Sequence, residues 1–156
     1  MVRKIFLLRH GEAIYPEQGM DDMERSLTSK GSTQIRALGV KMGEVGFDVG
    51  LTYCSTSDRT RQTFQHLSEA LKKNLEVEFR DDIYEASVRT LFELLCESDK
   101  NLMSILLIGH NPGITYLAEY LSGEIIGNMF PGQLVKLEFG MGDWSQLSQG
   151  SCGVIN

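Results

Sequence analysis

The chain has few cysteines and no long apolar run, and both absences exclude classes of protein. The apolar stretch near the N-terminus, Ile5 to Leu8, ends at Arg9 and His10, so it is too short for a secretory signal core or a membrane span. The three cysteines are far apart and form no CxxC pair or zinc spacing, which favours reduced thiols. We therefore expect a cytoplasmic protein without a membrane partner.

An excess of positive charge is also missing. The net charge is −6, from 15 Lys and Arg against 21 Asp and Glu. An acidic protein has no overall field that attracts nucleic acid or an anionic membrane, so neither is an expected partner. If this chain binds a phosphate, its positive charge must be concentrated in one place.

Internal repeats, low-complexity tracts and Pro-rich linkers are absent as well. The length of 156 residues is typical of one domain and leaves little room for insertions. We therefore expect a single domain over residues 1–156.

Short apolar runs alternate with amphipathic stretches along most of the chain. The runs predict strands at Val2–Leu8, Val49–Tyr53, Leu75–Phe79, Leu102–Ile108 and Gln133–Phe139. Helices are expected to begin at Thr28, at Ser57 or Asp58, at Ser87 and at Pro112. This alternation predicts a layered α/β fold with a largely parallel sheet, and the tail predicts an edge strand around Trp144.

Polar groups follow three of the predicted strands. Arg9-His10-Gly11-Glu12 follows the first strand, the segment from Ser55 to Thr63 follows the second, and Gly109-His110-Asn111-Pro112-Gly113 follows the fourth. The carboxyl ends of parallel strands form the binding edge of such sheets. Arginine forks neutralise phosphoryl oxygens, and a neutral imidazole can attack phosphorus. The sequence therefore predicts a phosphoryl-transfer site.

These blocks carry a family resemblance. Arg9-His10-Gly11-Glu12 resembles the signature of the histidine phosphatase superfamily, whose fold is phosphoglycerate mutase-like. The other matching blocks are Arg25-Ser26-Leu27-Thr28 with Gly31, Ser55 with Arg59–Thr63, Asp82–Ser87 and Gly109–Gly113. The chain is most similar to the short SixA-type phosphohistidine phosphatases. The resemblance implies a three-layer α/β/α fold with a mainly parallel central sheet.

The resemblance also implies roles for individual residues. His10 is expected to be the nucleophile that accepts the phosphoryl group. Arg9 and Arg59 are expected to grip its oxygens, and His110 to donate a hydrogen bond to them in the transition state.

Further phosphate or substrate contacts are expected nearby. Gly11 is expected to let the backbone turn closely beneath the phosphate. Arg25 is evenly balanced between a substrate contact and a loop charge. Ser55 and Asn111 are candidates for secondary contacts.

The acid that protonates the leaving group has two candidates. Glu85 lies in a loop before a helix, and Glu12 lies beside the nucleophile, where its alternative role is to orient His10. A phosphoramidate leaving group needs less help from an acid than a sugar phosphate. No HxxH or HxH spacing links His10 and His110, so no metal and no cofactor are expected.

Three further reactive side chains have structural explanations. Arg61 lies two residues after Arg59 and should point away from the site if the helix has begun. His66 is expected on the surface of that helix. Cys54 has no activating neighbour in the sequence and is expected to be a buried thiol.

The short chain bears on the substrate. The loop from Tyr15 to Ser26 and the segment from Gly123 to Gly132 are the only candidates for a lid. An uncovered pocket accepts a phosphorylated residue on another protein, so phosphohistidine on a protein is the preferred substrate. The alternatives are a phosphatase for small phosphorylated metabolites and a non-catalytic phosphoprotein-binding module.

Overall fold

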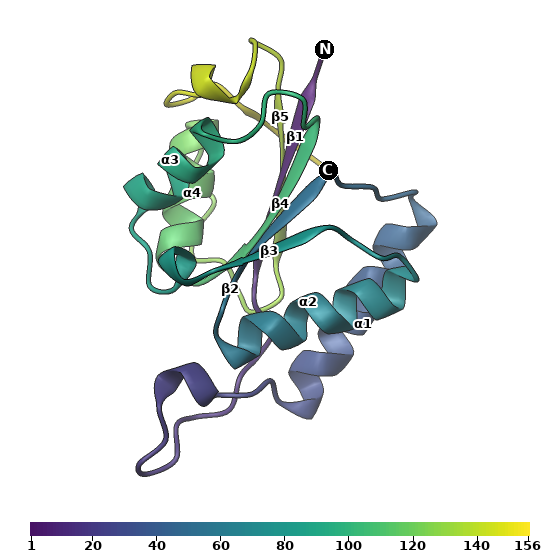
Figure 1. Cartoon of the computed structure of the whole chain (residues 1–156), viewed down its shortest axis with the longest axis vertical. Coiled ribbons are helices and arrows are strands. Elements are labelled where there is room, and N and C mark those ends of the chain that lie inside the picture. Colours follow the sequence, from purple (N-terminus) through teal and green to yellow (C-terminus); the bar gives the residue numbers. More distant parts are fainter.

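The computed structural model describes residues 1–156, and its centre is a six-stranded sheet between two layers of helices (Figure 1). The strand order is β3-β2-β4-β1-β5-β6. The strands are β1 (Arg3–Arg9), β2 (Leu51–Ser55), β3 (Val77–Arg80), β4 (Ser104–Gly109), β5 (Leu134–Phe139) and β6 (Gly153–Ile155). The pairs β3-β2, β2-β4 and β4-β1 are parallel, whereas β5 and β6 are added antiparallel. The expected α/β fold with a mainly parallel sheet is confirmed.

Two helices cover each face of the sheet. The helices α1 (Ser29–Glu44) and α2 (Asp58–Leu71) lie on one side, and α3 (Val88–Cys96) and α4 (Gly113–Ser122) lie on the other (Figure 1). None of them is both long enough and apolar enough to cross a membrane.

Three helix starts are fixed by the side chains that the sequence indicated. The side chains of Thr28, Ser57 and Ser87 accept hydrogen bonds from backbone N–H groups in the first turns of α1, α2 and α3. Such caps satisfy donors that have no partner inside the helix. Pro112 occupies the N-cap position of α4, one residue earlier than expected.

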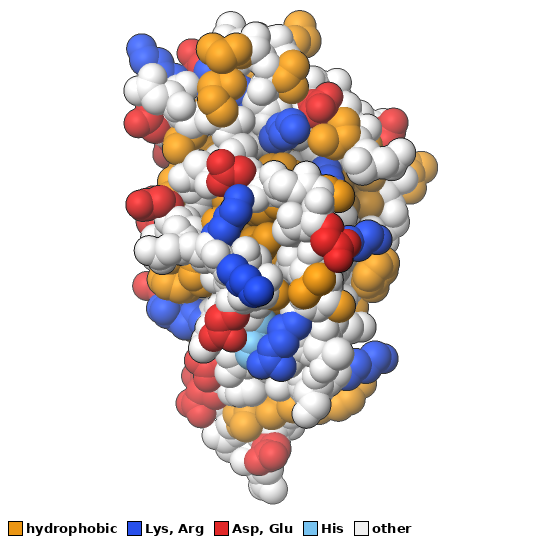
Figure 2. Space-filling model, turned by 90° about the vertical axis from the view of Figure 1, so that its right-hand side faces the viewer, with side chains coloured by type: hydrophobic (Ala, Val, Ile, Leu, Met, Phe, Trp, Pro, Cys, Tyr) orange, Lys and Arg blue, Asp and Glu red, His pale blue; other side chains and the backbone are white.

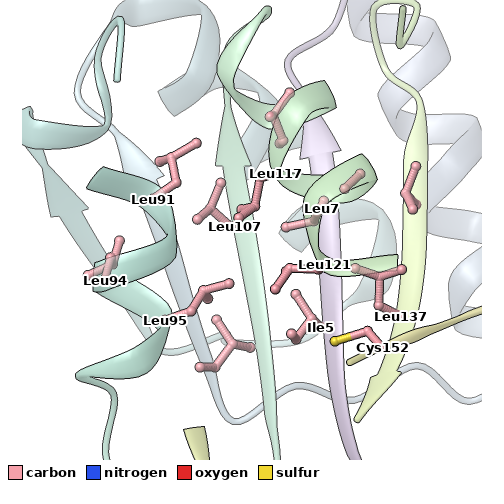
Figure 3. Close-up of a cluster of buried hydrophobic side chains, with 14 of the residues drawn as sticks. Ile5, Leu7, Leu91, Leu94, Leu95, Leu107, Leu117, Leu121, Leu137 and Cys152 are labelled. Carbon is pink, nitrogen blue, oxygen red and sulfur yellow. The ribbon is translucent and has the colours of Figure 1, made fainter. Parts of the chain in front are cut away.

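The core is divided between the two faces because side chains alternate along each strand. Ile5 and Leu7 of β1 pack with α3 and α4 (Figure 3), whereas Phe6 and Leu8 pack with α1 and α2. Both faces of β1 are therefore buried, which explains its continuous apolar run.

The expected edge strand around Trp144 is wrong. Residues Trp144–Gln146 form a short 3-10 helix, and the edge strand is β6 instead. Trp144 is fully buried in the core, and its indole N–H donates to the carbonyl of Leu102 at 3.1 Å. An edge strand would leave half of its side chains in solvent, whereas this turn buries the whole indole and satisfies its N–H.

Candidate active site

Three neighbouring strands deliver polar groups to one edge of the sheet. β2, β4 and β1 are adjacent, with Arg9 in register with Gly109 and Cys54 in register with Ile108. Their carboxyl ends therefore coincide, as predicted. His10 and His110 follow directly, with their ring centroids 5.4 Å apart.

His10 is buried and held in one tautomer. Its Nδ1 lies 2.7 Å from the carbonyl oxygen of Gly11, which can only accept, so Nδ1 carries the proton and Nε2 keeps its lone pair. Burial, and after it the charges of Arg59, Arg9 and Arg25, lower the pKa of His10 to about 4 against the opposing effect of the Gly11 hydrogen bond. At neutral pH the ring is uncharged, as a nucleophile must be.

His110 is oriented by Ser55. Its Nε2 lies 2.7 Å from the Ser55 hydroxyl oxygen, while its Nδ1 is buried without a partner. Burial, followed by the nearby His10, lowers the pKa of His110 to about 3. Ser55, a candidate phosphate contact in the sequence, thus holds the second histidine in place.

Two arginines at this edge are only partly paired. Arg9 donates through Nη1 to the carbonyl of Met129 at 2.7 Å. Arg59 donates through Nη1 to the carbonyl of Asp22 at 2.8 Å and through Nη2 to its Oδ2 at 2.9 Å. The Nε groups of both arginines are buried and have no partner. Unpartnered buried donors are costly, so an anion bound here would remove that cost.

Asp22 and Tyr84 belong to the same cluster, and the sequence interpretation missed both. The Asp22 carboxylate accepts hydrogen bonds from the Tyr84 hydroxyl, from Arg59 and, at 3.1 Å, from Arg25. The Tyr84 hydrogen bond, followed by those from the arginines, holds the pKa of Asp22 well below its ordinary value. The Tyr84 ring stands edge-on to His110, with centroids 5.3 Å apart.

The signals for these two residues in the sequence differ. Tyr84 lies within the Asp82–Ser87 block that resembles the family, so that block marked its neighbourhood. Asp22 stands among several acids of a loop and carries no local pattern.

Gly11 has a packing reason for its small size. A Cβ at Gly11 would lie 3.1 Å from the carbonyl oxygen of Gly31 and 3.1 Å from a side-chain carbon of Ile35. The loop after β1 therefore runs tightly against the start of α1. The Gly11 N–H donates to the Thr63 hydroxyl at 3.1 Å, which ties this loop to α2.

Two other candidate residues are engaged by the protein itself. Arg25 donates to the carbonyl of Ile14 at 2.7 Å as well as to Asp22. Asn111 donates to the carbonyl of Met129 at 2.8 Å, and its Oδ1 accepts from Thr115. Asn111 thus fastens the segment around Met129 to α4.

The two candidate acids lie in different surroundings. The Glu12 carboxylate accepts from the Thr28 hydroxyl at 2.7 Å, beside the start of α1. Glu85 is exposed, has a left-handed φ of 50°, and lines a pocket of about 550 Å³ together with His110, Asn111 and Tyr116. Glu85 therefore shares a pocket with the second histidine.

The remaining reactive side chains lie outside this cluster. Arg61 donates to the carbonyl of Thr56 at 3.0 Å and covers the Phe79 ring. Cys54 is buried, and burial raises the pKa of its thiol to about 12. No three His, Cys, Asp or Glu side chains gather in an arrangement that could hold a metal ion.

A family model and a curated relative match this chain. The model of the histidine phosphatase superfamily (branch 1) matches residues 5–98, which include His10 and Arg59 but end before His110. An uncharacterized protein of Mycobacterium tuberculosis (strain H37Rv) is 26% identical over 160 residues, covering 95% of this chain and 96% of that protein.

Solved structures share the fold over nearly the whole chain. A protein of Agrobacterium tumefaciens assigned as phosphohistidine phosphatase SixA has a TM-score of 0.82 and 26% identity, covering 88% of this chain and 92% of that one. The protein histidine phosphatase SixA complexed with tungstate has a TM-score of 0.84 and 20% identity, covering 98% and 94%. A mycobacterial glucosyl-3-phosphoglycerate phosphatase has a TM-score of 0.73 and 16% identity, covering 99% and 97%.

Proposed function

Because the chain belongs to the histidine phosphatase superfamily, we propose that it removes phosphoryl groups through a phosphohistidine formed on His10, and that its substrate is phosphohistidine on another protein. One observation carries the proposal. Around the neutral His10, the Nε atoms of Arg9 and Arg59 and the Nδ1 atom of His110 are buried without partners. A phosphoryl group would supply the oxygen acceptors that these nitrogens lack.

The first step is attack of His10 Nε2 on phosphorus. A nitrogen–phosphorus bond forms while the bond from phosphorus to the leaving group breaks, and the leaving group keeps the electron pair. Arg9 and Arg59 neutralise the equatorial oxygens, and His110 contacts them through Nδ1. The Nδ1–H bond to Gly11 stabilises the charge that develops on the His10 ring.

The second step is hydrolysis of the phosphoenzyme. Water attacks phosphorus, the bond to His10 Nε2 breaks, and orthophosphate leaves after the water has given up a proton. We assign Glu85 as the group that exchanges protons with the leaving group and the water, because it lines the pocket beside His110. A substrate imidazole leaves more readily than an alkoxide, so the dependence on this acid should be small.

The two candidate lids support a protein substrate. Residues 15–19 are exposed, and the loop between β1 and α1 extends away from the sheet (Figure 1). The segment from Gly123 to Gly132 is fastened at Met129 and at Glu119, whose carboxylate accepts from Ile126 N–H at 2.9 Å. A protein surface can therefore approach the pocket. Similarity to a protein histidine phosphatase points the same way.

Small phosphorylated metabolites are the second candidate, since a glucosyl-3-phosphoglycerate phosphatase shares the fold. A non-catalytic phosphoprotein-binding module is disfavoured because His10, Arg59 and His110 are all present.

A substrate panel separates these functions. We expect kcat/KM for a histidine-phosphorylated protein to exceed that for glucosyl-3-phosphoglycerate and nucleotide monophosphates by about 100-fold or more. His10→Ala should abolish every activity, and Arg61→Met, two residues after Arg59 in α2, should retain it. A preference for a sugar phosphate would overturn the substrate assignment, and binding without turnover would support the non-catalytic module.

A further inference from the structure

The sheet face that carries α1 and α2 has an open groove beside α1. Two adjoining hollows of about 390 and 460 Å³ share Met42, Val45 and Lys136. α1 forms the wall, whereas Phe6 of β1 and Leu134 of β5 belong to the floor. We call these two hollows together the α1 groove.

The opposite face of β5 is covered by a helix, whereas the face beside α1 is not. On that side Val135, Leu137 and Phe139 of β5 are buried in the core with α4 and Trp144. On the α1 side, Leu134 and Lys136 remain partly exposed. The α1 groove is thus the place where a third helix would cover the sheet, at the usual distance of 8–10 Å from its neighbour.

The groove combines exposed apolar side chains with a buried apolar floor. Val45 is 71% exposed and Phe130 is 63% exposed, and both line the groove with the partly buried Leu38. Contiguous apolar surface of this kind is typical of an interaction site.

Lysines outnumber acidic side chains in the charged lining of the groove. Lys4, Lys41 and Lys136 line the groove, and no carboxylate lies within 4.0 Å of any of their ammonium groups. The acid that lines it, Asp48, lies 3.8 Å from Lys73 instead. Figure 2 shows Lys and Arg side chains spaced along the face that carries α1 and α2, with exposed hydrophobic atoms and Asp and Glu side chains between them. A chain of net charge −6 thus presents unpaired positive charge around an apolar groove.

One end of the α1 groove adjoins the nucleophile. Gly132 lines this end, and its N–H donates to the carbonyl of His10 at 2.9 Å. An occupant of the groove therefore lies against the segment that carries His10.

We propose that the α1 groove docks an acidic amphipathic helix of the phosphorylated protein, a substrate assignment that rests on the proposed function. The apolar stripe of the helix packs on Leu38, Val45 and Phe130, and its flanking carboxylates pair with Lys41 and Lys136. The lysines select the partner by charge, and the apolar contacts supply most of the binding energy.

Binding is tested with an 18-residue helical peptide that has leucine along one face and glutamate on both flanks. In NMR spectra of the 15N-labelled protein, we expect shift changes at Lys41, Val45 and Lys136. The variant Lys41→Glu/Lys136→Glu should raise the Kd at least tenfold, and Lys41→Gln/Lys136→Gln should raise it less. Lys100→Glu, an exposed lysine outside the groove, should leave the Kd unchanged.

Kinetics then connect the groove to the substrate. Lys41→Glu/Lys136→Glu should raise KM for a histidine-phosphorylated protein about tenfold and leave the hydrolysis of phosphoimidazole unchanged. An equal rise in KM for both substrates, or an equal effect of Lys100→Glu, would overturn the docking proposal.

Other occupants give different results. A dimer in sedimentation that Lys41→Glu/Lys136→Glu dissociates would assign the groove to a second copy of this chain. Binding to phosphatidylserine vesicles that the same variant loses would assign it to a membrane surface, and either result overturns the proposal. Absence of His10-dependent phosphoimidazole hydrolysis would refute the proposed function, whereas a groove-dependent peptide Kd would still support docking.

Discussion

An arginine is buried at each end of the central sheet, and the two arginines differ in their hydrogen-bond partners. At the end where β1 begins, Arg3 donates to the carbonyls of Gly142, Lys100 and Leu102 and lies over the Trp144 ring. At the end where β1 finishes, Arg59 keeps a buried Nε without a partner. The first arginine is satisfied by the fold, and the second needs a ligand. Side-chain burial alone therefore does not distinguish a structural arginine from a phosphate-binding one, whereas the set of hydrogen-bond partners does.

The largest expected effect is the loss of activity on substitution of Arg59, the arginine with an unpartnered Nε. Arg59→Met should lower kcat/KM by about 100- to 1000-fold, because one preorganised donor to the transition state is lost. The free energy of unfolding should change little, because the two lost hydrogen bonds both go to Asp22 in a loop and the buried, unpartnered Nε is removed with them. Steady-state kinetics and urea unfolding test both parts, and retention of a third of the activity would contradict the comparison.

Substitution of Arg3 should affect stability rather than activity. Arg3→Met should lower the free energy of unfolding by about 2–4 kcal/mol, because buried carbonyls lose a charged donor. The kcat/KM per folded molecule should stay at the wild-type value. Urea titration with an active-site count measures both, and a stable but inactive variant would argue against this assignment.

The pH dependence of the free energy of unfolding should also distinguish the two ends of the central sheet. The folded pKa values of His10, about 4, and His110, about 3, lie below the ordinary value of 6.5, so the unfolded chain binds more protons at mildly acid pH. Stability should therefore be complete above pH 6.5 and fall as the pH decreases toward 4. Between pH 7 and 5.5 each histidine should lower the free energy of unfolding by about 1 kcal/mol.

The variant His10→Gln/His110→Gln is the comparison for that titration. Its free energy of unfolding should depend less on pH over this range, while Arg3→Met should keep the wild-type dependence from an overall lower value. Identical slopes for the double variant and the wild type would show that the two rings are not buried in the uncharged form.

The smallest expected effect concerns the carboxylate that pairs with Arg59. Asp22→Asn should lower the inhibition constant of orthophosphate about threefold to tenfold, because one negative charge beside the anion site is removed. Glu24→Gln, in the same loop turn, makes the same charge change as a control. Competitive inhibition assays measure both, and weaker phosphate binding by Asp22→Asn would mean that this carboxylate chiefly positions Arg59.

Local chemistry explains how far the sequence predicted the fold and the site. Thr28, Ser57 and Ser87 cap helices as expected because capping depends on neighbours in the chain. The meeting of His10 with His110 followed from parallel strands ending at one edge. These predictions needed only short-range pattern and topology.

The features that were missed depend on contacts between distant segments. Asp22 reaches Arg59 and Tyr84 because the loop after β1 returns to the site, and no periodicity encodes that return. The sequence predicts a strand around Trp144, and this prediction is wrong because Trp144 packs against Arg3 and Leu102. Both residues are distant in the chain, so no local pattern indicates these contacts. Asn111 stays a candidate for a secondary substrate contact, and its side chain also joins the segment around Met129 to α4, which the sequence did not indicate.

Trapping of the phosphoenzyme tests the central claim most directly. The protein is mixed briefly with 32P-labelled phosphoimidazole, quenched in denaturant and digested to locate the label. We predict an acid-labile label on the peptide that contains His10, present in the wild type and in Arg61→Met and absent in His10→Ala. Label at the wild-type level in His10→Ala, or an acid-stable label elsewhere, would contradict the assignment of His10 as the nucleophile.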